Sequence, residues 1–366
     1  MLAQSQVAHY LNQNGLTASE HFVNCDFTVM EASRRNRNFK VLSQHGPCYL
    51  LKQGIGSAAT ETVKHEAAVY KLLRQLPSNS SLLGYIPQFI KYDSLQQILI
   101  LELLHDAQDF REYSERHGRF SVSIATALGT ALSTLHRATI PAIGIAREIG
   151  LQDRLPWVLS IHRPGLGIFR DTSSANIQLI RIVQNAAALP LLLDSLRDGW
   201  RIDAVTHNDI KWDNCLVFPV KRSHNRLALK LVDWEFANLG DSCWDAGAVF
   251  SSYLGSWLLS IPVSGEDPPD QFLDLAQCPL GRMQPAIRAY WRAYACGMNF
   301  DAVESEEHLL RAVRYGAARL IQTAYEQMQH STSLTGNIIC LLQLSLNILQ
   351  RPHEAIAHLL GLSLKA

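Results

Sequence analysis

The chain has 366 residues, of which 47% are hydrophobic and 18% are charged. This length and composition predict a globular protein of two or three domains with sizeable cores. Its 33 Lys and Arg residues balance its 33 Asp and Glu residues, so the total charge indicates neither a general polyanion-binding surface nor an acidic trap for polycations. We therefore expect no nucleic-acid partner, and any binding site must come from local clusters.

The opening segment, MLAQSQVAHYLNQNG, lacks the charged leader, the continuous apolar segment and the cleavage site of a signal peptide. No run of about twenty apolar residues is present to span a bilayer. The seven cysteines are scattered, odd in number and without a CxxC pair, so the sequence predicts neither a disulfide framework nor a zinc site. We expect a cytoplasmic protein without a membrane partner.

Short β-rich segments separated by polar or Gly/Pro turns predict a small antiparallel sheet in the first hundred residues or so. A helix is expected over 57–76, because Val63, Ala67 and Tyr70 recur at helical spacing. It falls between a three-stranded meander and two further strands. The strands are expected at 27–32, 38–44, 48–54, 87–94 and 97–104.

From about residue 106 the pattern changes to helices. The segments 109–118 and 122–138 have the helical period, residues 139–172 read as irregular, and two helices split at Pro190 follow over 173–200. Beyond two short strands at 215–220 and 227–236, the remainder is mostly helical. The sequence therefore predicts an α+β protein, with a β-rich nucleotide-binding lobe over 1–104 and a mainly helical catalytic and acceptor-binding lobe over 105–366.

A dense polar motif, HNDIKWDN, occupies residues 207–214. Asp209, Asn214 five positions later, and Asp233 at the end of a predicted strand form the set that phosphoryl transfer requires. Asp209 can accept the proton of an acceptor hydroxyl, while Asn214 and Asp233 offer the hard oxygen ligands that suit Mg²⁺. Lys211 is placed to neutralise charge on the transferred group, and His207 is expected to brace the loop.

The motif and the later LVDWE resemble the HxDxxxxN and D-W/F-x pair of the aminoglycoside phosphotransferase and choline kinase family, distant relatives of protein kinases. The resemblance covers most of the chain and implies a bilobal protein-kinase-like fold that uses ATP and Mg²⁺. It implies that Lys52, in YLLKQG, grips the phosphates and that Glu66 on the next helix orients it. It also implies that backbone from Glu102 to Leu104 meets the adenine base.

Two further segments resemble the family and one departs from it. In LSTLHRA, His136 is expected to be structural, and in GDSCWDAG, Asp245 is expected to hold the catalytic loop. The phosphate-covering turn reads SRRNRNF and lacks the glycines of protein kinases. Ser33 and Asn36 are expected there as nucleotide contacts, because backbone N–H groups and nearby guanidinium groups can bind phosphate.

A lone HxDxxxxN is a weak signal, since polar turns often contain Asp and Asn for conformational reasons. Its weight comes from its order relative to Lys52, Glu66 and Asp233. A non-catalytic pseudokinase that binds nucleotide as a scaffold is the alternative. Such proteins usually lack the base, the metal-binding Asp or the strand Lys, and all three are present in this sequence.

The acceptor is expected to be a hydroxyl-bearing small molecule or a Ser/Thr of a ribosomally made precursor peptide, as in class V lanthipeptide and thioamitide pathways. A polycationic aminoglycoside is less favoured, because the only dense acidic cluster of the helical lobe is 301–308. A basic or apolar groove across 139–200 favours the peptide. A closed acidic pocket counts against it.

Overall fold

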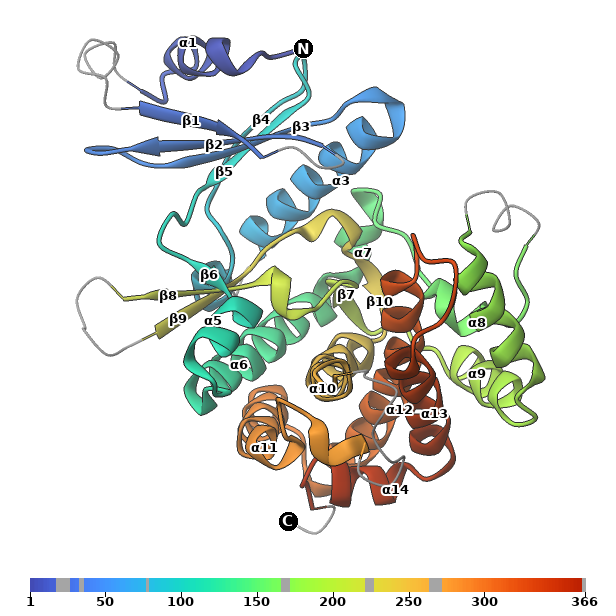
Figure 1. Ribbon diagram of the computed structural model, residues 1–366. Helices are drawn as coiled ribbons and strands as arrows, with labels where there is room; N and C mark the ends of the chain where they lie inside the picture. The colour runs from blue at the N-terminus through green and yellow to red at the C-terminus, as the bar shows by residue number, and fades with distance from the viewer. Residues whose placement is uncertain are drawn as a thin grey trace. The chain divides into compact units, whose positions relative to one another are not determined.

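Figure 1 shows a computed structural model of the chain, which describes residues 1–17, 27–32, 36–76, 79–165, 172–220, 227–262 and 272–363. The chain divides into two compact units. The first unit combines Met1–Phe110 with Asp213–Ala237, and the second combines Arg111–Trp212 with Asn238–Ala366. The lobes predicted from the sequence divide the chain once, after residue 104, whereas here a later hairpin returns to the first unit. It does so because its first strand pairs with residues just before Phe110.

The first unit is built on a five-stranded antiparallel sheet in the order β1-β2-β3-β5-β4. The predicted meander forms its first three strands. The most apolar strand, β5, lies inside the sheet between β3 and β4, which agrees with the near-continuous burial of its side chains. The strands are β1 Phe27–Glu31, β2 Arg37–Ser43, β3 Tyr49–Gln53, β4 Phe89–Asp93 and β5 Ile98–Glu102.

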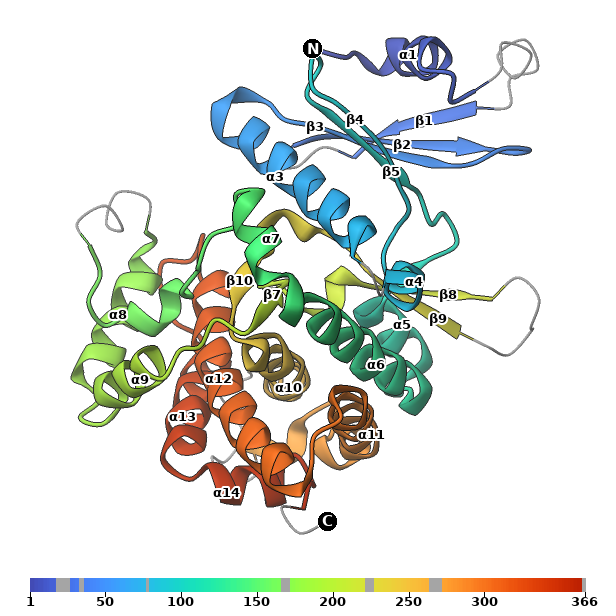
Figure 2. The same ribbon diagram turned by 180° about the vertical axis from the view of Figure 1, so that it is seen from behind.

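Helices cover both faces of this sheet (Figures 1 and 2). Side chains alternate between the two faces of a strand. On β3, Tyr49 and Leu51 join a buried cluster with residues of α1 (Val7–Gln13). The next residue, Lys52, therefore faces the other side, where α3 (Gly56–Gln75) lies. The alternation of side chains along β3 thus points Lys52 away from the apolar cluster and towards α3.

A second sheet of three strands completes the first unit, in the order β6-β8-β9. β6 is Gln108–Asp109, β8 is Cys215–Pro219 and β9 is Leu227–Leu231. β6 is not predicted by the sequence, because two residues carry no periodicity. The strand predicted over 227–236 ends at Leu231, since Asp233 adopts a left-handed backbone conformation with φ of 68° that a strand cannot continue. The KRSHNR segment, predicted as the turn of this hairpin, lies outside the described residues.

The second unit is helical and contains α10, which is buried along almost its whole length. α10 packs against α12, and α6 packs against α11 (Figure 1). Both contacts are close because glycines lie in them: a Cβ on Gly129 of α6 or on Gly247 of α10 would clash with backbone of the facing helix. The helices are α5 Phe110–His117, α6 Val122–Thr139, α7 Ile143–Glu148, α8 Ser174–Asn185, α9 Leu189–Asp198, α10 Ser242–Leu259, α11 Leu280–Met298, α12 Ala302–Gln327, α13 Gly336–Gln350 and α14 Pro352–Glu354. The short helix α4, Asn79–Leu82, belongs to the first unit.

The break between α8 and α9 precedes Pro190 rather than falling at it. Pro190 lies in the first turn of α9, where a missing N–H leaves no helical hydrogen bond unmade. The segment predicted to be irregular, 139–172, contains the short α7 and several turns. Among the described residues no single helix is both long and apolar enough to cross a membrane, and α8 with α9 meet that test only as a sharply bent pair.

Two short strands precede and follow the start of the HNDIKWDN motif in the second unit. β7 (Ala204–Thr206) pairs antiparallel with β10 (Asn238–Gly240), and Asp153 bridges to Leu239 on the other side of β10. Each strand has three residues, too few for a sequence pattern. Because Thr206 is the last residue of β7, the HNDIKWDN motif leaves directly from the edge of a hydrogen-bonded ladder.

Candidate active site

Lys52 and Glu66 form a buried ion pair in the first unit. Lys52 Nζ donates to both carboxylate oxygens of Glu66 at 2.9 Å. The Glu66 side chain is fully buried and that of Lys52 is 8% exposed. Fourteen residues apart in sequence, the two meet because β3 points Lys52 at α3 and the helical period turns Glu66 towards the sheet.

Asp233 completes this cluster from a distant part of the chain. Lys52 Nζ also donates to Asp233 Oδ1 at 2.8 Å, and the Asp233 side chain is 37% exposed. The next residue, Trp234, donates its backbone N–H to Glu66 at 3.3 Å, which fixes the turn after β9. Burial alone would lower the pKa of Lys52, but the carboxylates of Glu66 and Asp233 outweigh it and raise that pKa above its ordinary value. Lys52 is thus a firmly charged cation between two acids.

Asn214 and Asp233 lie at the same end of the β8–β9 hairpin. Asn214 directly precedes β8, and its carbonyl oxygen accepts the N–H of Val232 at 3.0 Å. An amide oxygen and a carboxylate are hard donors, so the pair fits a magnesium ion, which commonly takes one or two protein oxygens and completes its shell with water and phosphate. Within the described ranges no group of three His, Cys, Asp or Glu side chains is placed to hold a metal ion.

The backbone at the start of the HNDIKWDN motif is held by a carboxylate from α10. Asp245 is fully buried and accepts the N–H groups of His207 at 2.6 Å and Asn208 at 3.0 Å. Asn208 has a left-handed φ of 65°, a conformation that Asn tolerates better than most residues. His136 Nε2 lies 3.4 Å from Asp245 and its Nδ1 lies 2.9 Å from the Tyr294 hydroxyl. The expected structural contacts of Asp245 and His136 are present.

Asp209 lies between two cations in the second unit. Lys211 Nζ donates to Asp209 Oδ2 at 2.7 Å, and Arg319 Nη2 of α12 lies 3.9 Å from Oδ1. His207, fully buried, accepts the Asp209 N–H at its Nδ1 at 3.3 Å, which is the bracing contact expected of it. The Asp209 side chain is 10% exposed and that of Lys211 is 37% exposed. The carboxylate is therefore fixed in place while remaining partly accessible.

Trp212 packs in the second unit. Its ring lies 5.1 Å from those of both Phe120 and Tyr253. The aromatic contacts place it in the core, with 3% exposure. Asp213, the neighbouring acid, is exposed.

The predicted adenine-binding backbone follows β5. The Glu102 N–H donates to Gln88 and the Leu103 N–H donates to Cys48, both at 2.9 Å, while the Leu104 carbonyl accepts the Ala107 N–H at 3.2 Å. The Glu102 side chain pairs with Lys230 of β9 at 2.7 Å. The contacts of Glu102 and Leu104 with nucleotide stay a prediction.

The predicted phosphate-covering turn is described only in part. Ser33 lies outside the described residues. Asn36 precedes β2 and is buried, and its Oδ1 has no hydrogen-bond partner in the described part of the chain. Arg37 pairs with Glu31 across the turn at 3.0 Å. A buried amide with an unmade hydrogen bond is suited to a ligand contact, and the nucleotide role of Asn36 stays a prediction.

Arg319 and Lys230 are the charged neighbours of the site that sequence reasoning missed. Arg319 lies in RYGAARL on α12, 105 residues after the end of the motif, and it reads as an ordinary helix-surface arginine. The sequence does contain a weak indication that Arg319 is buried. The small residues at 316–318 permit the close approach of another helix that buries it. Lys230 alternates with apolar residues on a strand and looks like a solvated side chain.

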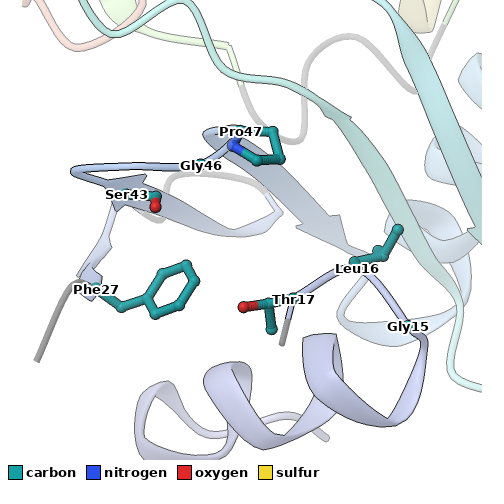
Figure 3. A pocket seen from close by; sticks show the side chains of 7 residues that line it. All are labelled: Gly15, Leu16, Thr17, Phe27, Ser43, Gly46 and Pro47. Atoms are coloured by element: carbon teal, nitrogen blue, oxygen red, sulfur yellow. The ribbon is translucent and has the colours of Figure 1, made fainter. Parts of the chain in front are cut away.

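A pocket of about 310 Å³ lies elsewhere in the first unit, between the end of α1 and the β2–β3 turn (Figure 3). None of its lining residues is a predicted site residue. The lining residues are Gly15, Leu16, Thr17, Phe27, Ser43, Gly46 and Pro47.

The model of the phosphotransferase enzyme (APH) family matches residues 26–268, which is more than half of the chain. The chain belongs to this family. It is a kinase, and the matched segment contains Lys52, Glu66, Asp209, Asn214 and Asp233. A search of curated proteins found no significant match.

Solved structures show that this kinase has the protein-kinase-like fold. The amicoumacin kinase hAmiN, in complex with AMP-PNP, Ca²⁺ and Ami, is 11% identical with a TM-score of 0.51, over 93% of this chain and 96% of that one. The GDP complex of aminoglycoside 2'-phosphotransferase-IIIa is 11% identical with a TM-score of 0.51, over 96% and 100%. A macrolide 2'-phosphotransferase type I is 15% identical with a TM-score of 0.50, over 93% and 95%. At these identities the likeness establishes the fold alone.

Proposed function

We propose that this kinase transfers the γ-phosphoryl group of ATP, bound with Mg²⁺, to a hydroxyl of a small molecule. The observation that carries the proposal is the cluster in which Lys52 binds Glu66 and Asp233 together. The three come from β3, α3 and the turn after β9, in the order that nucleotide-binding kinases use. A structurally similar kinase is described in complex with AMP-PNP and Ca²⁺, which supports a triphosphate and a divalent cation.

In the first unit, Lys52 would bind the α- and β-phosphates, with Glu66 holding its ammonium group in place. Asn214 and Asp233 would hold Mg²⁺, and the ion would neutralise charge on the phosphates when bound. Asp233 is the more exposed of the two acids that contact Lys52. We expect Lys52 to exchange its bond to Asp233 for one to phosphate on nucleotide binding.

In the second unit, Asp209 would accept the acceptor's hydroxyl proton as the hydroxyl oxygen forms its bond to the γ-phosphorus. The bond from that phosphorus to the bridging oxygen breaks, and ADP leaves with the electron pair. Lys211 would move from Asp209 towards the transferred group and stabilise its charge. His207 and Asp245 hold the loop and take no proton in this step.

The small-molecule acceptor is supported by the names of similar kinases, which act on macrolide, aminoglycoside or amicoumacin. Exposed apolar side chains in the segment expected to contact the acceptor favour a weakly charged molecule over a polycation. The precursor peptide stays a prediction, since exposed side chains alone do not define a groove. The exposed apolar residues are Ile140, Ile145, Ile149, Leu155 and Trp157.

The test measures ADP release and phosphorylated product by mass spectrometry, with Mg-ATP and a panel of a macrolide, an aminoglycoside, choline and a Ser/Thr peptide. We expect one small-molecule class to gain a phosphoryl group. Asp209→Asn should lower turnover about 10²- to 10⁴-fold, the contribution of a general base. Asp213→Asn is the matched control, because it makes the same change at an exposed acid of the same motif.

Three outcomes would contradict the proposal. Mg-ATP binding without turnover on any acceptor would favour the scaffold alternative. Phosphorylation of the peptide alone would replace the small molecule as substrate. Full activity in Asp233→Asn at low Mg²⁺ concentration would remove Asp233 from the metal site.

A further inference from the structure

Arg319 of α12 reaches the catalytic motif from outside it. Its Nη2 donates to the Ile210 carbonyl at 3.2 Å and lies 3.9 Å from Asp209 Oδ1. The first distance is a hydrogen bond and the second is an ion pair without one. Arg319 therefore holds both the backbone after Asp209 and, through charge, the carboxylate itself.

The guanidinium group is held in place by packing. It lies over the ring of Trp244 in α10, with 5.4 Å from its central carbon to the ring centroid, a favourable position for a cation against an aromatic face. The Arg319 side chain is only 6% exposed. Burying a cation this deeply is costly unless it gains partners, so the position of Arg319 requires a compensating contact such as that with the motif.

Two glycines bring the helices together at this point. Gly316 lies three residues before Arg319 on α12, and Gly247 lies three residues after Trp244 on α10. A Cβ on Gly316 would lie 2.8 Å from the Gly247 carbonyl oxygen, too close for any other residue without a shift. Positions three apart share a helix face. The close contact between the two glycines therefore brings Arg319 into contact with the ring of Trp244.

The catalytic motif is thus held from two helices by opposite charges. Asp245 of α10 accepts the backbone N–H groups of His207 and Asn208. Arg319 of α12 donates to the carbonyl oxygen of Ile210. Asp209 lies between these two attachments, so a loss of either would free the carboxylate to move.

We infer that Arg319 is a positioning residue for Asp209, one that keeps the carboxylate aligned when Lys211 leaves it for the phosphoryl group. The inference rests on the proposed role of Asp209 as the base. Lys211 occupies Oδ2, the partly exposed Lys211 can move, and the buried Arg319 cannot. Arg319 Nη1 is buried and has no hydrogen-bond partner among the described residues. The guanidinium group therefore retains an unused hydrogen-bond donor at this nitrogen.

The experiment measures steady-state ADP release, with water as acceptor and with any acceptor that the panel identifies. Arg319→Met should lower kcat about 10- to 100-fold with an unchanged KM for ATP, the effect of losing a charged hydrogen bond in the transition state. Arg319→Lys should recover part of this loss, because it keeps the charge but not the planar fork. A full kcat in Arg319→Met would overturn the inference.

A double-variant cycle separates positioning from a merely structural role. If Arg319 acts through Asp209, then Asp209→Asn and Asp209→Asn/Arg319→Met should turn over equally slowly. Equal fold losses from Arg319→Met in both backgrounds would overturn the inference. A wild-type chain without ADP release, or an Asp209→Asn variant with full activity, would instead overturn the proposed function on which this inference rests.

Arg311 is the matched control on the same helix. It pairs with Asp241 at the start of α10, and its side chain is 17% exposed. Arg311→Met should lower the melting temperature as much as Arg319→Met or more, while kcat per folded molecule stays at the wild-type value. An equal loss of kcat in both variants would show that α12 arginines act through stability, and would overturn the inference.

Discussion

The charged clusters around Lys52 and around Asp209 have opposite compositions. In the first unit one cation, Lys52, is shared by the carboxylates of Glu66 and Asp233. In the second unit one carboxylate, Asp209, is shared by the cations of Lys211 and Arg319. The first cluster has surplus negative charge and suits a divalent cation. The second has surplus positive charge and suits an anion such as a transferring phosphoryl group.

The clusters also share a pattern of burial. Each contains one member with a side chain that is 37% exposed, Asp233 in the first and Lys211 in the second. The other members are at most 10% exposed. A ligand replaces the partner that can move at the smallest cost, so the exposed member is the one expected to change partners. Glu66 and Arg319, the most buried members of their clusters, then serve to hold the geometry rather than to contact substrate.

Breaking the first cluster should have the largest effect. Lys52→Met leaves Glu66 as a buried carboxylate that still accepts the Trp234 N–H but has lost its cation, and removal of one member of a buried pair costs about 3–5 kcal/mol. Chemical denaturation measures the loss in unfolding free energy. Burial raises the pKa of Glu66 against the opposing effect of Lys52, and without the lysine protonation relieves the buried charge. The deficit should therefore grow as pH rises from 5 to 8.

The variant Lys52→Met/Glu66→Leu serves as the control for this prediction. It replaces the buried pair with apolar side chains, a change that is often neutral for stability. We expect it to recover most of the lost unfolding free energy while ATP affinity stays low. A single Lys52→Met variant with wild-type stability at pH 8 would contradict the buried ion pair.

Loss of the Asp245 hydrogen bonds that hold the loop around Asp209 should cause the next largest loss of stability. Asp245→Asn replaces a fully buried acceptor of two N–H groups with an amide that can direct only one oxygen at them. Hydrogen bonds to charged groups contribute about 1.5–3 kcal/mol each, so we expect a loss of about 2–3 kcal/mol in unfolding free energy. Activity per folded molecule should fall as well, because Asp209 follows directly in the chain. Unchanged turnover would show that the loop holds its shape without Asp245.

The sequence predicted the first cluster better than the second. Lys52 and Glu66 could be named because the family resemblance implies a lysine on the third strand and a glutamate on the next helix, and Asp233 because it follows the motif at the end of a predicted strand. Arg319 could not, since a helical arginine is buried only when another helix approaches closely, and that contact depends on Gly247 and Gly316. Local pattern carries the secondary structure, whereas long-range packing decides which ordinary charges become buried.

The same distinction applies to the fold. The five strands of the main sheet and helices α3, α6 and α12 have enough residues to show a period. β6, β7 and β10 have two or three residues each and exist only through their partners. The left-handed turn at Asp233 was likewise hidden, because neither Asp nor its neighbours signal where a strand stops.

A side chain added at the contact between Gly247 and Gly316 should affect the Asp209 cluster, although neither glycine belongs to it. A Cβ in Gly247→Ala would lie 2.7 Å from the Gly316 backbone nitrogen and would clash with the Ala312 carbonyl oxygen. Overpacking of this kind costs about 1–3 kcal/mol, and we expect a value near the middle of that range. Separation of α10 and α12 should also reduce kcat through Arg319. Gly255→Ala, on the same helix with open space around its Cβ position, should leave kcat unchanged and should not destabilise the protein, since Ala favours a helix interior over Gly.

The smallest effect is expected outside both clusters, where α1 docks on the main sheet. Tyr10→Phe removes a hydroxyl that donates to Asp93 at 3.0 Å, and the loss should be about 1 kcal/mol in unfolding free energy. Burial and the Asp93 carboxylate raise the pKa of Tyr10 above its ordinary value. The folded state thus favours the protonated phenol, so its contribution is complete below about pH 10, the pKa of an unfolded tyrosine, and is lost as pH rises further. The difference between wild type and variant should therefore be constant from pH 6 to 9 and shrink above pH 10, with turnover unaffected throughout. A loss comparable to that of Lys52→Met would show that docking of α1, rather than the buried ion pair, dominates the stability of the first unit.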